Sequence, residues 1–429
     1  MNRSAVRDFQ APGISVRRGE LLVPTQVGDP ARGQLPCPAG PLIAGSLQRK
    51  GWPSVLAPVP RLDDPGSDAR DARDAIVYLV TCPQRDGSTA ALAAAASPDD
   101  RLAAAAASAA VEEWAAVVGT RRLLAAGGPW CGGALRALAA ARSTALDYAR
   151  EGRVVHILGD LAAPPEAAGE LAARGTSRIT SLAGVPAGDI VIFPAHGVPP
   201  GVRAEAAERG ITVVDATCPL VAGVQDQAAR LAERGDDLVL IGRAADAVAA
   251  GITGHAPGRA AVVESVAGTA TLRVTDARRV SYLLQPGLPV ESAAAVATAL
   301  RSRFPSARGP DPDGYCYAPS DRAQTVRAIA ADCDLMLVLG QADSGDARHL
   351  CGLARDGGAR TQVIAGVGEL TPAMLGGVSA IGMAESTSAP SALAGQVRAA
   401  LSGLGPLSVV TRQVSSQITG EQVAARAAT

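Results

Sequence analysis

One plan is repeated three times in the C-terminal two thirds of this 429-residue chain. In each pass a strand runs into a cysteine, a helix follows, and a very apolar strand closes on a glycine. The cysteines are Cys131, Cys218 and Cys316, and the closing glycines are Gly159, Gly242 and Gly340. Each pass then ends with another apolar strand, a polar or Pro/Gly loop, and a further helix. Apolar strands that alternate with helices are typical of parallel sheets covered on both faces, so the repeat predicts three copies of a small α/β unit.

The repeat also predicts the domain organisation. We expect α/β units over residues 120–210, 211–305 and 306–410, each carrying one of the three cysteines. Residues 1–119 form an N-terminal extension of unknown role. One segment of this extension weakly resembles the cysteine–helix–strand plan, namely QLPCPAGPLIAGSLQRKGWPSVLAPVP. One interpretation is therefore that the extension contains a degenerate α/β unit. Residues 411–429 read as a polar tail.

The three repeated cysteines are the first candidates for chemistry. They sit at the carboxyl ends of strands, where active sites of parallel α/β units gather. A pseudo-threefold arrangement of the units would bring the three thiols towards one point. Three thiolates cannot complete a four-cysteine iron–sulfur or zinc site, but they can hold a [4Fe–4S] cubane and leave its fourth iron open. A zinc ion with three thiolates and a water, or three small buried core residues, are the alternatives.

Composition narrows the function classes. The chain has 40 Lys and Arg residues and 41 Asp and Glu residues, which gives a formal charge of -1. It lacks the excess of positive charge that is typical of proteins that bind nucleic acids or anionic membranes. Aromatic residues make up 3%, too few for a base-stacking platform. The N-terminus lacks the apolar region of a secretory signal. The most apolar stretch, residues 90–118, is interrupted by charged residues, which a membrane-spanning helix would not tolerate. We therefore expect a cytoplasmic protein with no nucleic-acid or membrane partner.

The stretch AHGVPPGVRAEAAERGITVVDATCPLV, with CYAPSDRAQ and STSAP, resembles the 4-hydroxy-3-methylbut-2-enyl diphosphate reductase family over about residues 120–405. This family closes the non-mevalonate isoprenoid route. The resemblance implies a trefoil of three α/β units around a central [4Fe–4S] cluster with three cysteine ligands, here Cys131, Cys218 and Cys316. It implies an oxygen-sensitive oxidoreductase in which the open iron takes a substrate hydroxyl, and two electrons with protons remove it as water. The implied partners are a small-molecule substrate and a ferredoxin- or flavodoxin-like electron donor.

Part of the family's substrate pocket is retained. The resemblance matches His196 to the histidine of the family's AHGV motif and Ser388 to the serine of its Ala-Pro loop. Ser344 keeps one serine of a Ser-Ser-Asn-Ser run, in which Asp346 replaces the asparagine. The resemblance therefore implies that His196, Ser344, Asp346 and Ser388 bind the substrate.

Other pocket positions differ from the family pattern. The first-unit histidine corresponds to Ala163, and a threonine corresponds to Pro286. In the second unit, Asp246 replaces a histidine and Val248 replaces the proton-donating glutamate. A diphosphate needs convergent donors in positive or neutral surroundings, whereas these exchanges remove donors and add carboxylates. We therefore expect a retained cluster and a changed substrate.

The main hypothesis is a [4Fe–4S] enzyme that carries out reductive dehydroxylation, or a related elimination, on a substrate other than the family's diphosphate. His196, Asp246 and Asp346 are its candidate catalytic residues, because the two aspartates are the best remaining proton donors. The first alternative is the authentic 4-hydroxy-3-methylbut-2-enyl diphosphate reductase of isoprenoid biosynthesis. The second alternative is a non-catalytic iron–sulfur sensor or electron-transfer protein.

Overall fold

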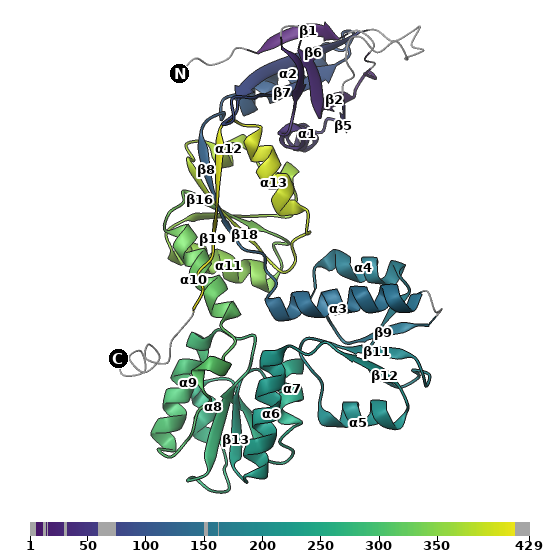
Figure 1. The fold of residues 1–429 in the computed structure, drawn as a ribbon. Helices are drawn as coiled ribbons and strands as arrows, with labels where there is room; N and C mark the ends of the chain where they lie inside the picture. Colours follow the sequence, from purple (N-terminus) through teal and green to yellow (C-terminus); the bar gives the residue numbers. More distant parts are fainter. Residues whose placement is uncertain are drawn as a thin grey trace. The chain divides into compact units, whose positions relative to one another are not determined.

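The computed structural model describes residues 6–11, 14, 16–29, 32–58, 74–149, 153–161 and 163–416. They divide into two compact units, one formed by Met1–Gly128 with Thr325–Arg412 and the other by Pro129–Gln324 with Gln413–Thr429. Figure 1 labels many of the elements of both units. Among the described residues, no helix is long and apolar enough to cross a membrane. Most of the polar tail expected at 411–429 lies outside the described residues.

The first unit begins with a five-stranded mixed sheet. Its order is β1 (Arg7–Ala11), β6 (Ala75–Pro83), β7 (Thr89–Ala96), β2 (Leu21–Pro24) and β5 (Ser54–Ala57). Neighbours are antiparallel except β2 and β5, which run parallel on either side of α1 (Gly40–Arg49) in the sequence. The hairpin of β3 (Gln26–Asp29) and β4 (Gly33–Pro36) precedes α1, and α2 (Arg101–Ala115) follows β7. Within the described part of the extension, only β2–α1–β5 has the parallel connection of the repeat plan.

Strand β7 consists almost entirely of alanine. Residues 90–96 are all buried. Leu92, Ala94 and Ala96 share a core with alanines of α2, and the alternate residues 91, 93 and 95 face a second core. Small side chains let the helix approach the sheet closely, and burial outweighs alanine's intrinsic preference for helix. A segment that composition alone would make helical therefore becomes a central strand.

The C-terminal part of the same unit is a five-stranded parallel sheet. Its order is β17 (Arg360–Ile364), β16 (Leu335–Leu339), β18 (Ala380–Glu385), β8 (Arg121–Ala126) and β19 (Leu407–Arg412). The connections contain α11 (Gly345–Asp356), the 3-10 turn η2 (Val367–Glu369), α12 (Pro372–Leu375) and α13 (Leu393–Ser402).

One hydrophobic core joins the N-terminal sheet to this parallel sheet. It contains Leu42 of α1, Trp114 of α2, Leu337 of β16 and Val397 of α13, all fully buried. The Trp114 Nε1 atom donates a hydrogen bond to Ser46 Oγ at 3.0 Å, so the polar end of the buried indole is satisfied. The extension is therefore packed into this unit as part of its core.

The second unit contains two parallel sheets. The first has the order β10 (Thr176–Ile179), β9 (Val155–Leu158), β11 (Ile190–Phe193) and β12 (Thr212–Asp215). Helices α3 (Gly132–Ala149) and α4 (Pro165–Ala173) cover one face of this sheet, and α5 (Pro200–Glu208) covers the other (Figure 1).

The other sheet of this unit has the order β14 (Ala260–Val263), β13 (Asp237–Ile241) and β15 (Val280–Leu284). Helices α6 (Pro219–Glu233) and α7 (Ala247–Thr253) pack on one face, while α8 (Val266–Thr271) and α9 (Val290–Arg303) pack on the opposite face. The 3-10 turn η1 (Pro312–Gly314) and α10 (Ala318–Ala330) follow. The expected α/β fold class with several parallel sheets is confirmed.

Two strands pair in a different sheet from the one that the repeat suggests. Strand β8 lies in the range 120–210 but pairs with β18 and β19, and β12 lies in 211–305 but pairs with β11. Similarly, Arg308 bridges to Ser281 in β15 just before the chain reaches Cys316. Cys218 and Cys316 therefore follow segments that pair with the preceding sheet, whereas Cys131 follows a strand that pairs with the C-terminal sheet. An apolar pattern shows that a strand is buried, but not which sheet it joins.

Candidate functional site

The three repeated cysteines lie at the starts of helices in the second unit. Cys131 directly precedes α3, Cys218 is the N-cap residue of α6 with Pro219 at its first position, and Cys316 lies two residues before α10. Proline at the first helical position is preorganised for a helix, which places Cys218 at the helix end. The partial positive charge of a helix N-terminus favours an anionic group such as a thiolate. Each element thus presents its cysteine where negative charge is tolerated.

The three thiols come close to one another within this unit. A Cβ atom on Gly133 would lie 2.7 Å from the Cys218 sulfur and 3.8 Å from the Cys131 sulfur, so both sulfurs border the same small space. Burial raises the pKa of the Cys316 thiol, and the backbone N–H groups of Gly287 and Ala318 lower it in part. The thiols of Cys131 and Cys218 raise the same pKa through charge repulsion, which requires them to be near Cys316.

This donor set suits a cluster better than a single ion. Thiolates that share one zinc ion at about 2.3 Å must lie within about 4 Å of one another. In the described part of the chain, no three His, Cys, Asp or Glu side chains are close enough to hold one metal ion. A cubane instead receives each thiolate on a different iron, which suits three convergent but separated sulfurs. The residues present therefore fit a [4Fe–4S] cluster with three cysteine ligands.

The loop before Cys218 is held by a network of hydrogen bonds. Asp215 Oδ1 accepts the Thr217 N–H at 3.0 Å, and Asp215 Oδ2 pairs with Arg203 at 2.5 Å. Burial tends to raise the pKa of Asp215, but the bonds from Arg203 and Thr217 outweigh it and lower the pKa. The Cys218 N–H donates to the Ala195 carbonyl at 2.9 Å. Cys218 is therefore tied to the turn that carries His196.

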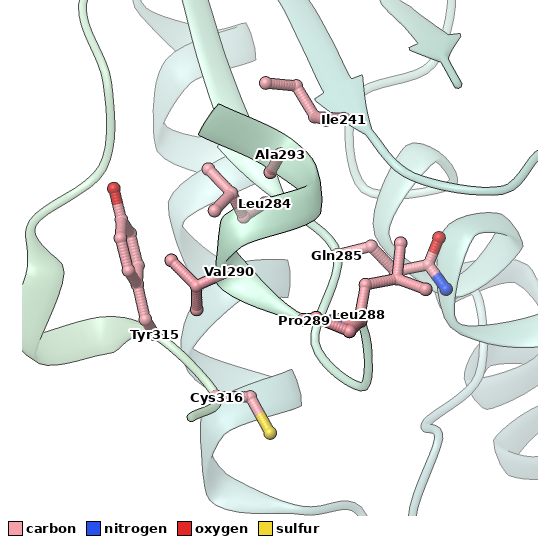
Figure 2. Close-up of a pocket in the computed structure, with 9 residues that line it drawn as sticks. All are labelled: Ile241, Leu284, Gln285, Leu288, Pro289, Val290, Ala293, Tyr315 and Cys316. Carbon is pink, nitrogen blue, oxygen red and sulfur yellow. The ribbon is translucent and has the colours of Figure 1, made fainter. Parts of the chain in front are cut away.

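A mainly apolar crevice lies beside Cys316. Figure 2 shows the Cys316 sulfur near the end of β15 and the start of α9, with Tyr315 on the same segment. The residues that line the crevice are Ile241, Leu284, Gln285, Leu288, Pro289, Val290, Ala293, Tyr315 and Cys316. The Gln285 side chain is oriented because its Oε1 accepts the Arg243 N–H at 2.7 Å. These surroundings limit water around this sulfur.

His196 is presented on a tight turn at the end of β11. Gly197 has φ of +71°, and a Cβ there would lie 2.4 Å from Gln225 Nε2, so only glycine fits. Gly251 of α7 packs against the same turn, with the position of its missing Cβ 3.6 Å from the His196 carbonyl oxygen. The half-buried imidazole is thus held at the junction of the two sheets of this unit.

Asp246 and Val248 occupy the start of α7. The Asp246 carboxylate caps the helix by accepting the Val248 N–H at 2.9 Å, and the Val248 side chain is buried in the core. Capping is the usual role of an aspartate at this place. Val248 cannot donate a proton, and Asp246 is already used as a hydrogen-bond acceptor.

The remaining predicted pocket residues, Ser344, Asp346 and Ser388, lie in the other unit. They gather at the carboxyl ends of β16 and β18, as active-site loops of a parallel sheet do. Asp346 accepts the Thr387 N–H at 2.7 Å, Ser388 Oγ accepts the Gln341 N–H at 2.9 Å, and Ser344 caps α11. These side chains therefore join two loops at one edge of the sheet.

The other cysteines have packing roles. Cys37 and Cys82 are fully buried in the extension, and burial raises their pKa values to about 12 and about 11. Burial also raises the pKa values of Cys333 and Cys351, which lie in the same unit. Protonated, buried thiols behave as small apolar groups.

Several residues that shape the site were missed from the sequence. Gly133 makes room for the Cys218 sulfur, and Arg136, Arg203 and Asp215 hold the neighbouring loop. The signal available for Asp215 was its place three residues before Cys218 in DATC. The contact of Arg136 joins residues 81 positions apart, which no local pattern reveals.

The sequence is similar to a known protein family and to named relatives from other organisms. The LytB protein family matches residues 123–402. A Mycobacterium bovis protein named 4-hydroxy-3-methylbut-2-enyl diphosphate reductase 2 is 40% identical over 252 residues, covering 58% of this chain and 77% of the relative. A Bordetella bronchiseptica protein named 4-hydroxy-3-methylbut-2-enyl diphosphate reductase is 40% identical over 242 residues, covering 56% and 74%.

Solved structures share the fold. The structure of the E-1-hydroxy-2-methyl-but-2-enyl-4-diphosphate reductase from Plasmodium falciparum superposes with a TM-score of 0.59 at 22% identity, covering 72% of this chain and 98% of that one. A second structure, of (E)-4-hydroxy-3-methyl-but-2-enyl diphosphate reductase, gives a TM-score of 0.54 at 24% identity, covering 66% and 99%.

Proposed function

The chain belongs to the LytB protein family, and we propose that it is a [4Fe–4S] reductase that removes the allylic hydroxyl group of 4-hydroxy-3-methylbut-2-enyl diphosphate. The relatives from Mycobacterium bovis and Bordetella bronchiseptica are named for this reductase. The reaction consumes two electrons and two protons. The carbon–oxygen bond breaks, one proton leaves with the oxygen as water, and the other is taken up by carbon.

The observation that carries the proposal is the approach of three thiols from three helix starts inside one compact unit. Cys131, Cys218 and Cys316 are the ligands that would hold the cluster. When bound, such a cluster supplies electrons and one Lewis-acidic iron without a protein ligand. A chain with this trio needs an outside one-electron donor, for which we propose a ferredoxin- or flavodoxin-like protein.

The chain's own residues bind and protonate the substrate. We assign His196 as the principal proton-handling and phosphate-facing group, because its turn is tied to Cys218 through Ala195. We propose Ser344, Asp346 and Ser388 as further substrate-binding residues. Asp246 and Asp346 are weaker candidates for proton donation, because both carboxylates already accept backbone N–H bonds.

Turnover by anaerobically reconstituted protein tests the proposal. With a chemical one-electron reductant, the wild type should convert 4-hydroxy-3-methylbut-2-enyl diphosphate to the dehydroxylated diphosphates and water. The His196→Asn variant should keep its iron and lose roughly 10²–10⁴-fold in rate. A fully loaded wild type that leaves the diphosphate unchanged would refute this substrate.

A second substrate class is favoured by the start of α7. The family's histidine and glutamate are Asp246 and Val248 here, one a helix cap and the other a buried core residue. A carboxylate at this place repels a diphosphate by like charge. The second candidate is therefore reductive dehydroxylation of a less anionic allylic alcohol. Faster turnover of the diphosphate-free alcohol than of the diphosphate would favour this class.

A further inference from the structure

The peptide group between Thr217 and Cys218 is held at both of its polar ends. Its N–H donates to the Ala195 carbonyl at 2.9 Å, and its carbonyl accepts from Arg136 Nη2 at 3.0 Å. Arg136 belongs to the second turn of α3, the helix that starts directly after Cys131. Ala195 is the residue before His196. One peptide plane therefore connects the helix of Cys131, the turn of His196 and Cys218 itself.

The Thr217 side chain restrains the same peptide plane from a third direction. The backbone N–H and the hydroxyl of Thr217 both donate to Asp215 Oδ1. Arg203 Nη2 lies 3.4 Å from Thr217 Oγ1. Asp215 lies on β12, and Arg203 lies on α5, which packs against the sheet that contains β12. These two residues therefore fix the loop to the sheet that precedes it in the chain. Arg136 differs from them because it reaches the loop from the helix of another cysteine. An arginine suits this role, since its guanidinium is always charged and hydrogen bonds from charged donors are strong.

We propose that Arg136 is a positioning residue that fixes the Cys218 thiol relative to the Cys131 thiol, an inference that rests on the proposed cluster. The two sulfurs flank Gly133, and the Arg136–Thr217 bond spans the same gap one helical turn further along α3. Loss of this bond frees the carbonyl before Cys218 while leaving all three thiols in the chain. The variant then still has all three cysteines, but the distance between the Cys131 and Cys218 sulfurs is no longer fixed.

Three variants test this role. Arg136→Met removes the donor and keeps much of the side chain's length, and Arg136→Lys restores a charged donor at a similar reach. The matched control is Arg142→Met on the same helix, where the guanidinium pairs with Glu170 at 3.1 Å. Circular dichroism and thermal melting of the apo-proteins establish that each variant folds.

The first readout needs no cluster. In the apo-protein, amide hydrogen exchange of a peptide covering residues 213–220 should accelerate in Arg136→Met and stay at the wild-type rate in Arg142→Met. The second readout is the rate at which a chelator removes iron from anaerobically reconstituted protein. We expect it to rise about 10–100-fold in Arg136→Met, the range typical for groups that orient metal ligands, and to recover in Arg136→Lys.

The outcomes separate this inference from the proposed function. A wild type that cannot be loaded with iron refutes the cluster, whereas the exchange experiment still tests the contact of Arg136. A loaded wild type with unchanged exchange and unchanged iron release in Arg136→Met overturns the positioning role. Equal effects of Arg136→Met and Arg142→Met also overturn it, because they reveal general loosening of α3.

Discussion

At the scale of single residues, the site depends on a missing side chain. Gly133 leaves the space into which the Cys218 sulfur projects, and a Cβ there would lie 2.7 Å from that sulfur. We expect Gly133→Ala to displace the Cys218 thiol and to weaken iron binding by about 10–100-fold, as changes beside metal ligands do. Titration of the reconstituted protein with a chelator measures this loss.

The neighbouring glycine provides the control. Gly132 has no atom within 4 Å of the position of an added Cβ, so Gly132→Ala should bind iron like the wild type. Equal iron affinity in the two variants would show that the space beside Gly133 does not matter.

A second residue-scale prediction concerns Asp236, a buried carboxylate at the start of the second unit's three-stranded sheet. The hydrogen bond from Arg234 lowers its pKa most, burial opposes this, and the Ser281 hydroxyl at 2.7 Å lowers the pKa further. Because the native pKa lies below the unfolded one, the stabilisation is complete above the unfolded pKa of about 4 and is lost as the pH falls through the native pKa.

We therefore expect Asp236→Asn to lower the free energy of unfolding by about 1–3 kcal/mol at pH 7, and by less at each step below about pH 4. Urea unfolding of the apo-protein over this pH range measures the difference. A difference that stays constant down to pH 2 would contradict the assignment.

At the scale of elements, helix α1 contacts the backbone of η2 at Gly45. A Cβ on Gly45 would lie 2.2 Å from the Gly368 carbonyl oxygen in η2, and backbone cannot rotate away as a side chain can. We expect Gly45→Ala to lower the free energy of unfolding by about 1–3 kcal/mol, although alanine favours helix over glycine by about 1 kcal/mol. Denaturant unfolding measures the change.

Gly352 in the interior of α11 is the matched control for Gly45. No atom lies within 4 Å of an added Cβ there, so Gly352→Ala should gain up to about 1 kcal/mol from helix propensity. The same sign of change in both variants would show that the α1–η2 contact is not close.

The elements also show what sequence patterns can and cannot predict. The apolar runs of β13 and β16 and the helices after each cysteine follow directly from periodicity, because burial leaves that signature. The strands that pair with β8 and β12 cannot be predicted from periodicity, because pairing depends on contacts between residues far apart in the sequence. The burial of residues 90–96 in a strand likewise depends on two distant cores, one of them shared with the α2 alanines.

At the scale of the whole molecule, the repeat predicts the α/β class, and the family is shown by comparison over residues 123–402. The three cysteines could be proposed as cluster ligands from spacing and resemblance, because they recur at equivalent places in each repeat. The residues proposed to orient these cysteines could not be found in this way, because the contacts of Arg136 and Gly133 exist only after folding. Such a contact also gives Asp246 a structural role, because its carboxylate caps α7.

Mössbauer spectroscopy of anaerobic protein reconstituted with ⁵⁷Fe tests the central claim most directly. Three cysteine ligands on a four-iron cluster predict that about one quarter of the iron gives its own spectral component, because that iron lacks a thiolate. Substrate addition should change this component and leave the other three quarters nearly unchanged. Protein that stays colourless and iron-free, or a spectrum in which all four irons are equivalent, would contradict the account.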